Sequence, residues 1–165
     1  MTPLLNLLKK IISGGQTGAD VGGLLAAREL GIETGGIAPK GWLTEDGPQE
    51  VLLRSFGLTE CEEEGFPART RRNVADSSGT LLIGQYRTGG SRLTFEVAKQ
   101  LNKPLFLVAF RNIPNIDEFR RWLEQNKIQV LNVAGNRESQ SPGIGEFTRQ
   151  FLLEACRVKD SIVPP

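Results

Sequence analysis

The chain has 165 residues, a net charge of +1 at pH 7, and hydrophobic and charged fractions of 39% and 24%, which predict one globular domain over residues 1–165. The near-zero charge gives no electrostatic footprint for nucleic acid. The chain contains no histidine, which excludes Ser-His-Asp catalysis, Cys-His catalysis and His-ligated metals. Cys61 and Cys156 lie far apart, so we expect no disulfide framework and no metal site.

The sequence also carries no sign of a membrane partner. No apolar run reaches the roughly 18 residues that a membrane-spanning helix requires. Lys9 and Lys10 follow the apolar stretch near the N-terminus, whereas the basic residues of a signal peptide precede it. We therefore expect a cytoplasmic protein.

Short apolar runs alternate with helical patterns along the chain. Strands are predicted at 7–12, 34–38, 80–84, 104–110 and 128–133. Helices are predicted at 19–30, 49–55, 69–76, 93–101 and 143–158, with a further helix that starts after Asn115 and is capped together with Glu118. Residues 58–67 are predicted as an acidic, solvated loop. The pattern predicts an α/β fold with a mainly parallel sheet of about five strands.

The turn after the first predicted strand is the first candidate ligand site. It contains Gly14, Gly15, Gln16, Thr17, Gly18 and Asp20, and a helix follows it. Backbone N–H groups at the start of a helix are unpaired and suit an anion such as phosphate, and glycine allows the ligand to approach closely. The spacing matches neither the dinucleotide fingerprint nor the P-loop. A plain structural turn is the alternative.

Two further segments offer charged side chains. Lys40 follows the second predicted strand and suits a phosphate, while Glu45 and Asp46 suit a ribose hydroxyl or a magnesium ion, whose role the sequence leaves open. Arg69 and Arg72 share one face of a predicted helix, and their guanidinium groups match phosphate or carboxylate. The alternatives are an ordinary surface loop and a solvated basic face.

The loop after the strand at 80–84 is a second candidate anion site. Gly89 and Gly90 precede a helix, and Ser91 and Thr94 add hydroxyl groups. Glu96 lies in the first turns of that helix, where it is either an acid–base group or a partner of the helix dipole. After the last predicted strand, residues 134–139 are interpreted as a simple turn.

Together these segments resemble a known family. The motifs are Ser13-Gly14-Gly15-Gln16-Thr17-Gly18-Ala19-Asp20, Arg69-Thr70 with Asn73-Val74, Asp76 with Gly79-Thr80, and Gly89-Gly90-Ser91 with Leu93-Thr94. They resemble the molybdenum cofactor carrier proteins, which belong to a superfamily that includes YpsA and the LOG proteins. The likeness covers residues 10–110 by motif and the rest by element order. It implies a Rossmann-like three-layer sandwich, a phosphorylated nucleotide or molybdenum cofactor as ligand, and a homo-oligomer, either a dimer or a tetramer.

The resemblance also implies an alternative function. LOG enzymes are phosphoribohydrolases that release the base from a nucleoside monophosphate, and their motif is P-G-G-x-G-T-x-x-E. Gly89, Gly90 and Glu96 match its spacing, so the resemblance implies Glu96 as the catalytic residue. The threonine falls one position late, at Thr94, and Arg92 replaces the third glycine. A carrier or sensor of a phosphate-bearing small molecule is therefore the leading hypothesis, and an N-glycosidase is the alternative.

Overall fold

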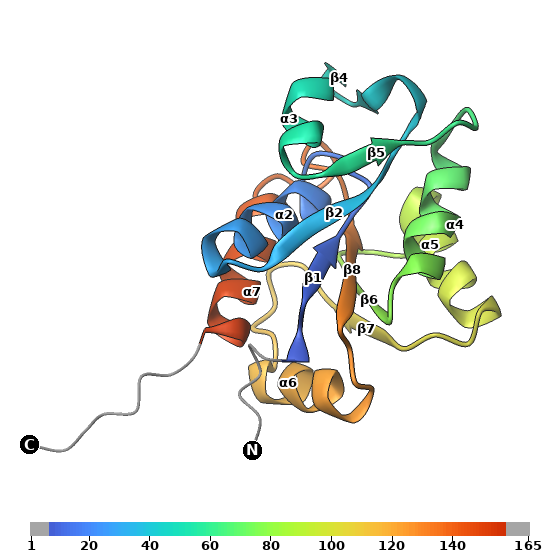
Figure 1. Cartoon of the computed structure of the whole chain (residues 1–165). Helices are drawn as coiled ribbons and strands as arrows, with labels where there is room; N and C mark the ends of the chain where they lie inside the picture. The colour runs from blue at the N-terminus through green and yellow to red at the C-terminus, as the bar shows by residue number, and fades with distance from the viewer. Residues whose placement is uncertain (1–6, 158–165) are drawn as a thin grey trace, which may run out of the picture.

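The fold is built on six parallel strands, which the computed structural model of residues 7–157 arranges in the order β5-β2-β1-β8-β6-β7. The strands are β1 (Lys10–Ile12), β2 (Glu33–Ala38), β5 (Leu58–Glu60), β6 (Gly79–Ile83), β7 (Leu105–Val108) and β8 (Val130–Gly135). Figure 1 shows their carboxyl ends along one edge of the sheet. The loops that leave these ends therefore lie near one another.

Helices cover both faces of this sheet, which makes the molecule a Rossmann-like three-layer α/β sandwich (Figure 1). On one face lie α2 (Ala19–Leu30), α6 (Ile116–Gln125) and α7 (Ile144–Cys156), and on the other lie α4 (Phe66–Asp76) and α5 (Gly89–Gln100). The main core lies under the first group, where Ile11, Leu81, Leu131 and Phe119 are fully buried. Burial of this apolar surface is the main force that holds the layers together.

Two segments that the sequence predicted as loops contain helices or strands. The predicted acidic loop at 58–67 contains β5 and the start of α4, because Leu58 is buried against Leu53 and Phe56 while the acidic residues stay in solvent. The segment after β2 forms a short 3-10 helix η1 (Lys40–Trp42) and a hairpin of β3 (Leu43–Thr44) and β4 (Gly47–Pro48) before α3 (Glu50–Ser55). Trp42 holds this segment against the rest of the protein, because its side chain is buried in the same cluster as Leu53, Phe56 and Leu58.

The C-terminal prediction is confirmed over the described residues. The predicted helix at 143–158 corresponds to α7, and its last predicted residue, Val158, lies outside the described range. The N-cap at Asn115 is confirmed as well, since its Oδ1 accepts the backbone N–H of Glu118 at 3.0 Å. Such caps satisfy a helix amide that has no partner within the helix.

Asn73 fixes α4 against the sheet. Its buried side chain accepts the N–H of Ile37 at 2.9 Å through Oδ1 and donates to the carbonyl of Ile37 at 2.9 Å through Nδ2. These bonds satisfy two backbone groups of β2 that would otherwise be buried without partners. They also set the position of the first turns of α4, which carry Phe66, Arg69 and Thr70.

Asn73→Asp should destabilise the fold. The carboxylate cannot donate to the carbonyl of Ile37 and brings a charge into a buried position, so we expect the unfolding free energy to fall by about 1–3 kcal/mol or more. Urea unfolding at neutral pH measures the change, and Asn112→Asp, in an exposed loop, is the control. Equal stability of the two variants would contradict a structural role for the Asn73 amide.

Candidate functional site

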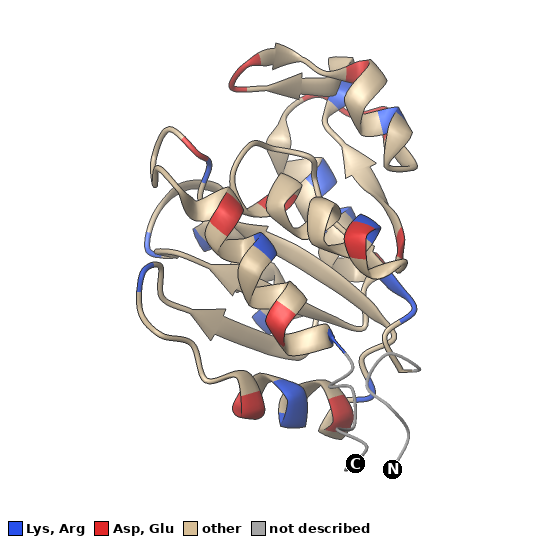
Figure 2. Cartoon of the chain, turned by 90° about the vertical axis from the view of Figure 1, so that its left-hand side faces the viewer, with Lys and Arg blue, Asp and Glu red and all other residues tan. Residues whose placement is uncertain are grey.

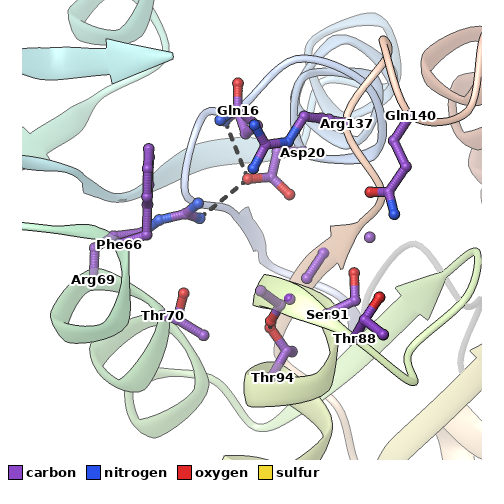
Figure 3. Close-up of a pocket in the computed structure, with 14 residues that line it drawn as sticks. Gln16, Asp20, Phe66, Arg69, Thr70, Thr88, Ser91, Thr94, Arg137 and Gln140 are labelled. Carbon is purple, nitrogen blue, oxygen red and sulfur yellow. Dashed lines mark hydrogen bonds and ion pairs between the residues drawn. The ribbon is translucent and has the colours of Figure 1, made fainter. Parts of the chain in front are cut away.

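A cavity of about 350 Å³ opens at the carboxyl edge of the sheet, above the ends of β1, β6 and β8. Its walls come from four segments: the β1–α2 turn, the start of α4, the start of α5 and the turn after β8. The lining residues are Gln16, Asp20, Phe66, Arg69, Thr70, Thr88, Gly89, Gly90, Ser91, Thr94, Ala134, Gly135, Arg137 and Gln140. Figure 3 shows Gln16, Asp20 and Arg137 on one side of the cavity and Ser91 and Thr94 on the facing side. Its volume lies within the range of about 300–1,000 Å³ that is typical of small-molecule sites.

The two glycine-rich turns thus meet at one cavity, but the first turn differs from its prediction as an anion cradle. Four of its amides already donate to oxygens of the protein: Gly15 N to Ser13 Oγ (3.3 Å), Gln16 N to Asp20 Oδ2 (3.1 Å), Thr17 N to Gln16 Oε1 (3.0 Å) and Ala19 N to Asn136 O (3.2 Å). The carboxylate of Asp20 occupies the place that a phosphate was expected to take. These four amides are therefore paired within the protein and are not free donors for a phosphate.

Close packing explains glycines in this turn. A Cβ on Gly14 would lie 1.6 Å from Nη1 of Arg69. Gly18 has a φ of +82°, which disfavours other residues, and a Cβ there would lie 2.5 Å from the carbonyl oxygen of Asn136. The first turn therefore needs glycine at these positions, because Arg69 and the backbone of Asn136 pack directly against it.

The centre of the cavity wall is an ion pair between Asp20 and Arg69. Nη1 of Arg69 lies 3.3 Å from Oδ2 of Asp20, and the two side chains are only 14% and 5% exposed. Burial raises the pKa of Asp20 above its ordinary value of 3.8, against the opposing effects of the Arg69 charge and of hydrogen bonds from the backbone of Gln16 and Gly14. Nε of Arg69 has no hydrogen-bond partner among residues 7–157, so the arginine keeps an unused donor.

The second glycine-rich turn has the open amides that the first lacks. Helix α5 begins at Gly89 rather than at Leu93, and no side chain caps its first turn. A Cβ added to Gly90 would meet nothing within 4 Å. Ser91 Oγ accepts a hydrogen bond from Asn136 Nδ2 at 3.2 Å, which leaves its own O–H free to donate. The start of α5 therefore presents backbone amides and a hydroxyl donor to the cavity, with the positive end of the helix dipole behind them.

The turn after β8 supplies residues that the sequence analysis assigned to a simple turn. Ala134, Gly135, Arg137 and Gln140 all line the cavity. Asn136 fixes this turn, because its Oδ1 accepts from the backbone N–H of Gln85 and its Nδ2 donates to the carbonyl of Gln85, both at 2.9 Å. No ion pair of Arg137 occurs within residues 7–157. In the sequence, Arg137 shortly after the last predicted strand was the one feature that indicated a ligand-binding role for this turn.

Several predicted site residues lie outside the cavity lining. Lys40 lies 3.8 Å from Glu64 in an exposed ion pair, and Arg72 is exposed on α4. Glu96 pairs with Arg92 at 2.8 Å, and its side chain is 45% exposed. Thr17 bonds to Glu45 and accepts the N–H of Glu138 at 3.2 Å. The remaining predicted residues, Gly14, Gly15 and Gly18, support the turn behind the lining.

Glu45 acts as a clamp between loops rather than as part of the cavity wall. Its carboxylate accepts hydrogen bonds from the hydroxyls of Thr17 and Ser139 and from the N–H of Ser139 at 3.1 Å. Gln16 adds a second tie, because its Oε1 accepts the N–H of Glu45 at 2.9 Å. These bonds join the β3–β4 hairpin to the turns after β1 and β8, and so hold two walls of the cavity in place.

Within 7–157, no group of three or more His, Cys, Asp or Glu side chains is placed to hold a metal ion. Over the same residues, no helix has both the length and the apolar character needed to cross a membrane.

Comparison with known proteins identifies the family. The model of the circularly permuted YpsA SLOG family matches residues 11–156, which include every segment of the cavity wall. The chain belongs to this family. A structure from Syntrophus aciditrophicus, of a protein provisionally named as a molybdenum carrier, is 38% identical and superposes with a TM-score of 0.82. The match covers 92% of this chain and 96% of that one.

Other comparisons add little to this SLOG-family assignment. No curated protein matches the chain significantly. A structure of (E)-4-hydroxy-3-methyl-but-2-enyl diphosphate reductase is 14% identical, with a TM-score of 0.39 over 92% of this chain and 62% of that one. This likeness is too weak to indicate a fold or a function.

The buried carboxylate makes stability depend on pH in a defined direction. Because the folded-state pKa of Asp20 is raised above 3.8, the folded protein binds more protons than the unfolded chain as the pH rises above that value. The contribution of Asp20 to the unfolding free energy is therefore complete below pH 3.8 and declines as the pH rises through its folded-state pKa. Asp20→Asn should remove this decline, as measured by urea unfolding from acidic to neutral pH.

The exposed Asp76, also on a helix beside the sheet, gives a matched control for this measurement. Asp76→Asn should follow the wild-type pH profile. An Asp20→Asn profile that runs parallel to wild type over the whole range is the outcome that contradicts a raised pKa.

Proposed function

We propose that this protein binds a phosphate-bearing nucleotide or a molybdopterin-like cofactor in the cavity at the carboxyl edge of the sheet, and that it acts as a carrier or sensor of that ligand. The observation that carries the proposal is the uncapped start of α5, which faces the cavity together with two arginines, Arg69 and Arg137. Backbone amides at a helix start and guanidinium groups are both strong donors to phosphate oxygens.

The phosphate is assigned to the amides of Gly89, Gly90 and Ser91. Asp20 is the one acidic side chain in the cavity lining, and on the facing α5 side the free O–H of Ser91 adds a donor. Arg137 lies across the cavity from Ser91, so its charge faces the same space (Figure 3). A negative group between these walls gains charge-assisted hydrogen bonds from one side and backbone donors from the other.

The part of the cavity lined by Phe66, Asp20 and Gln16 suits a planar heterocycle. Phe66 provides an aromatic ring, and Asp20 with Gln16 provides polar groups for the N–H and carbonyl edges of a base or pterin. Arg69 lies 5.5 Å from the ring centroid of Phe66, and its buried Nε has no hydrogen-bond partner among residues 7–157. The residues therefore fit both parts of a pterin phosphate, and the assignment agrees with the carrier name given to the relative from Syntrophus aciditrophicus.

In the molybdenum cofactor the metal is bound by the pterin itself, and the metal supplies redox chemistry in the enzymes that use it. The side chains of this chain would hold the organic part: donors at the start of α5 for the phosphate, and Asp20, Gln16 and Phe66 for the ring. A ribonucleotide presents the same two parts, a phosphate and a flat heterocycle. Native mass spectrometry of the purified protein distinguishes these two ligands by mass.

Two substitutions test the phosphate assignment. Gly90→Ala adds a methyl group that meets nothing in the protein within 4 Å, yet it stands beside the amides where the phosphate is expected. Arg137→Ala removes a charged donor whose hydrogen bonds to an anion are worth about 1.5–3 kcal/mol. We expect the affinity for AMP or GMP, measured by isothermal titration calorimetry, to fall about ten- to a hundredfold in each variant, with unchanged melting temperatures.

Arg72→Ala is the matched control, because Arg72 is an exposed arginine on α4 outside the cavity lining. It should leave the affinity unchanged. If Gly90→Ala and Arg137→Ala bind as tightly as the wild type, the phosphate does not lie at the start of α5 and the proposal fails.

The hydrolase alternative depends on the carboxylate of Glu96. Glu96 is held by Arg92 and does not line the cavity. We therefore expect Glu96→Gln to bind AMP as tightly as the wild type, and both proteins to release adenine from AMP no faster than buffer, as measured by chromatography. Release of adenine by the wild type that disappears in Glu96→Gln would restore the N-glycosidase function.

A further inference from the structure

Asp20 is the only acidic residue that is buried within residues 7–157. The other acidic residues lie mainly on the helices and loops around the sheet, as Figure 2 shows. Both hydrogen bonds that its side chain accepts from Gln16 N, at 3.1 Å, and Arg69 Nη1, at 3.3 Å, end on Oδ2. The other oxygen, Oδ1, points into the cavity and away from Arg69 (Figure 3). Asp20 therefore keeps an acceptor for a ligand, although its charge is already paired.

Gln16 supplies a donor beside this acceptor. Its Oε1 accepts the N–H of Thr17 at 3.0 Å and the N–H of Glu45 at 2.9 Å. Because both partners are donors, they fix which end of the amide is the oxygen, and the NH2 group lies at the other end. Nε2 forms no hydrogen bond within residues 7–157, and it is accessible, since Arg69 Nε is the one unpartnered side-chain atom there that is closed off from solvent. The buried Gln16 lines the cavity, so its NH2 group is available to a ligand.

An amide donor next to a carboxylate matches one edge of a heterocycle. Guanine and pterin carry a carbonyl, a ring N–H and an amino group side by side on one edge. The carbonyl can accept from Gln16 Nε2, while the ring N–H and the amino group donate to the carboxylate of Asp20. Adenine presents an amino group where guanine has the carbonyl, and an unprotonated nitrogen where guanine has the N–H. In adenine, two donors then face each other at Gln16, and a lone pair faces the carboxylate of Asp20.

We propose that Asp20 and Gln16 select a 2-amino-4-oxopyrimidine ring, the part that guanine and pterin share, and reject adenine. This inference rests on the proposed function, because it concerns the heterocycle of the same ligand. The two residues are held together by the bond from Gln16 N to Asp20 Oδ2, and Arg69 holds the same oxygen from the other side. Oδ2 therefore fixes the turn, and Oδ1 reads the ligand. A site that is fixed in this way discriminates strongly, because the wrong ring leaves buried polar groups unpaired.

A ligand series tests the selection on the wild-type full chain. GMP has the whole edge, IMP lacks its amino group, and AMP has neither the carbonyl nor the ring N–H. Isothermal titration calorimetry should find GMP tightest, IMP about tenfold weaker and AMP about a hundredfold weaker. 6-Hydroxymethylpterin phosphate carries the same edge as GMP and should displace AMP. Its affinity relative to that of GMP distinguishes a pterin from a nucleotide as the source of the ring.

Gln16→Glu tests the donor separately. The new carboxylate still accepts the N–H groups of Thr17 and Glu45 but has no NH2 group for a carbonyl. The ratio of GMP affinity to AMP affinity should fall at least tenfold. Gln100→Glu, exposed at the end of α5, makes the same charge change outside the cavity and should leave the ratio unchanged. Melting temperatures check that both variants are folded, and the wild-type series decides the question without them.

The outcomes separate this inference from the function on which it rests. If GMP binds no tighter than IMP, or no tighter than AMP, the selection by Asp20 and Gln16 is overturned, while the binding of a phosphorylated ligand stands. A folded Gln16→Glu variant that keeps the wild-type ratio overturns it as well. If GMP, IMP, AMP and the pterin phosphate all fail to bind, the inference and the proposed function fall together.

Discussion

The buried ion pair of Asp20 and Arg69 is the interaction on which the cavity depends. Asp20 lies in the first turn of α2 and accepts the amides of the turn before it, while Arg69 comes from α4 on the other face of the sheet. The pair therefore links two layers directly above the end of β1. Because both side chains are largely withdrawn from solvent, removal of one partner leaves a buried charge uncompensated, which typically destabilises a protein by about 3–5 kcal/mol.

The β1–α2 turn and the turn before α5 are alike in sequence, but their backbone amides have different partners. Both have paired glycines, hydroxyl side chains and a following helix. In the first turn the anion is supplied internally by Asp20, and the glycines make room for Arg69 and for the turn after β8. In the second turn no side chain caps the helix. In this chain, Asp20 pairs with the amides of the first turn, whereas no side chain caps the first turn of α5.

The sequence predicted the regular elements well and the wall of the cavity only in part. The bounds of α2 were predicted correctly, since apolar spacing ended at Gly31, which adopts a left-handed conformation. The start of α5 was misplaced because Gly89 and Gly90 are poor helix formers, yet both lie in its first turn. Arg137 was missed because Gly135 and Asn136 are typical turn residues, and only the tertiary fold brings β8 between β1 and β6. The pairing of Glu96 with Arg92 was predictable, because residues four apart on a helix are neighbours.

The carboxylate of Asp20 is also relevant to the proposed carrier function. Asp20 already occupies one end of the Arg69 guanidinium at 3.3 Å. In the proposed site the anion is therefore left to the open amides of α5 and to Arg137. An enzyme gains from charged groups that are held in place to stabilise the transition state. A carrier, in contrast, must also release the ligand that it binds. Under the proposed function, the first turn is satisfied by the protein itself, and the open start of α5 is the part of the cavity left for an external anion.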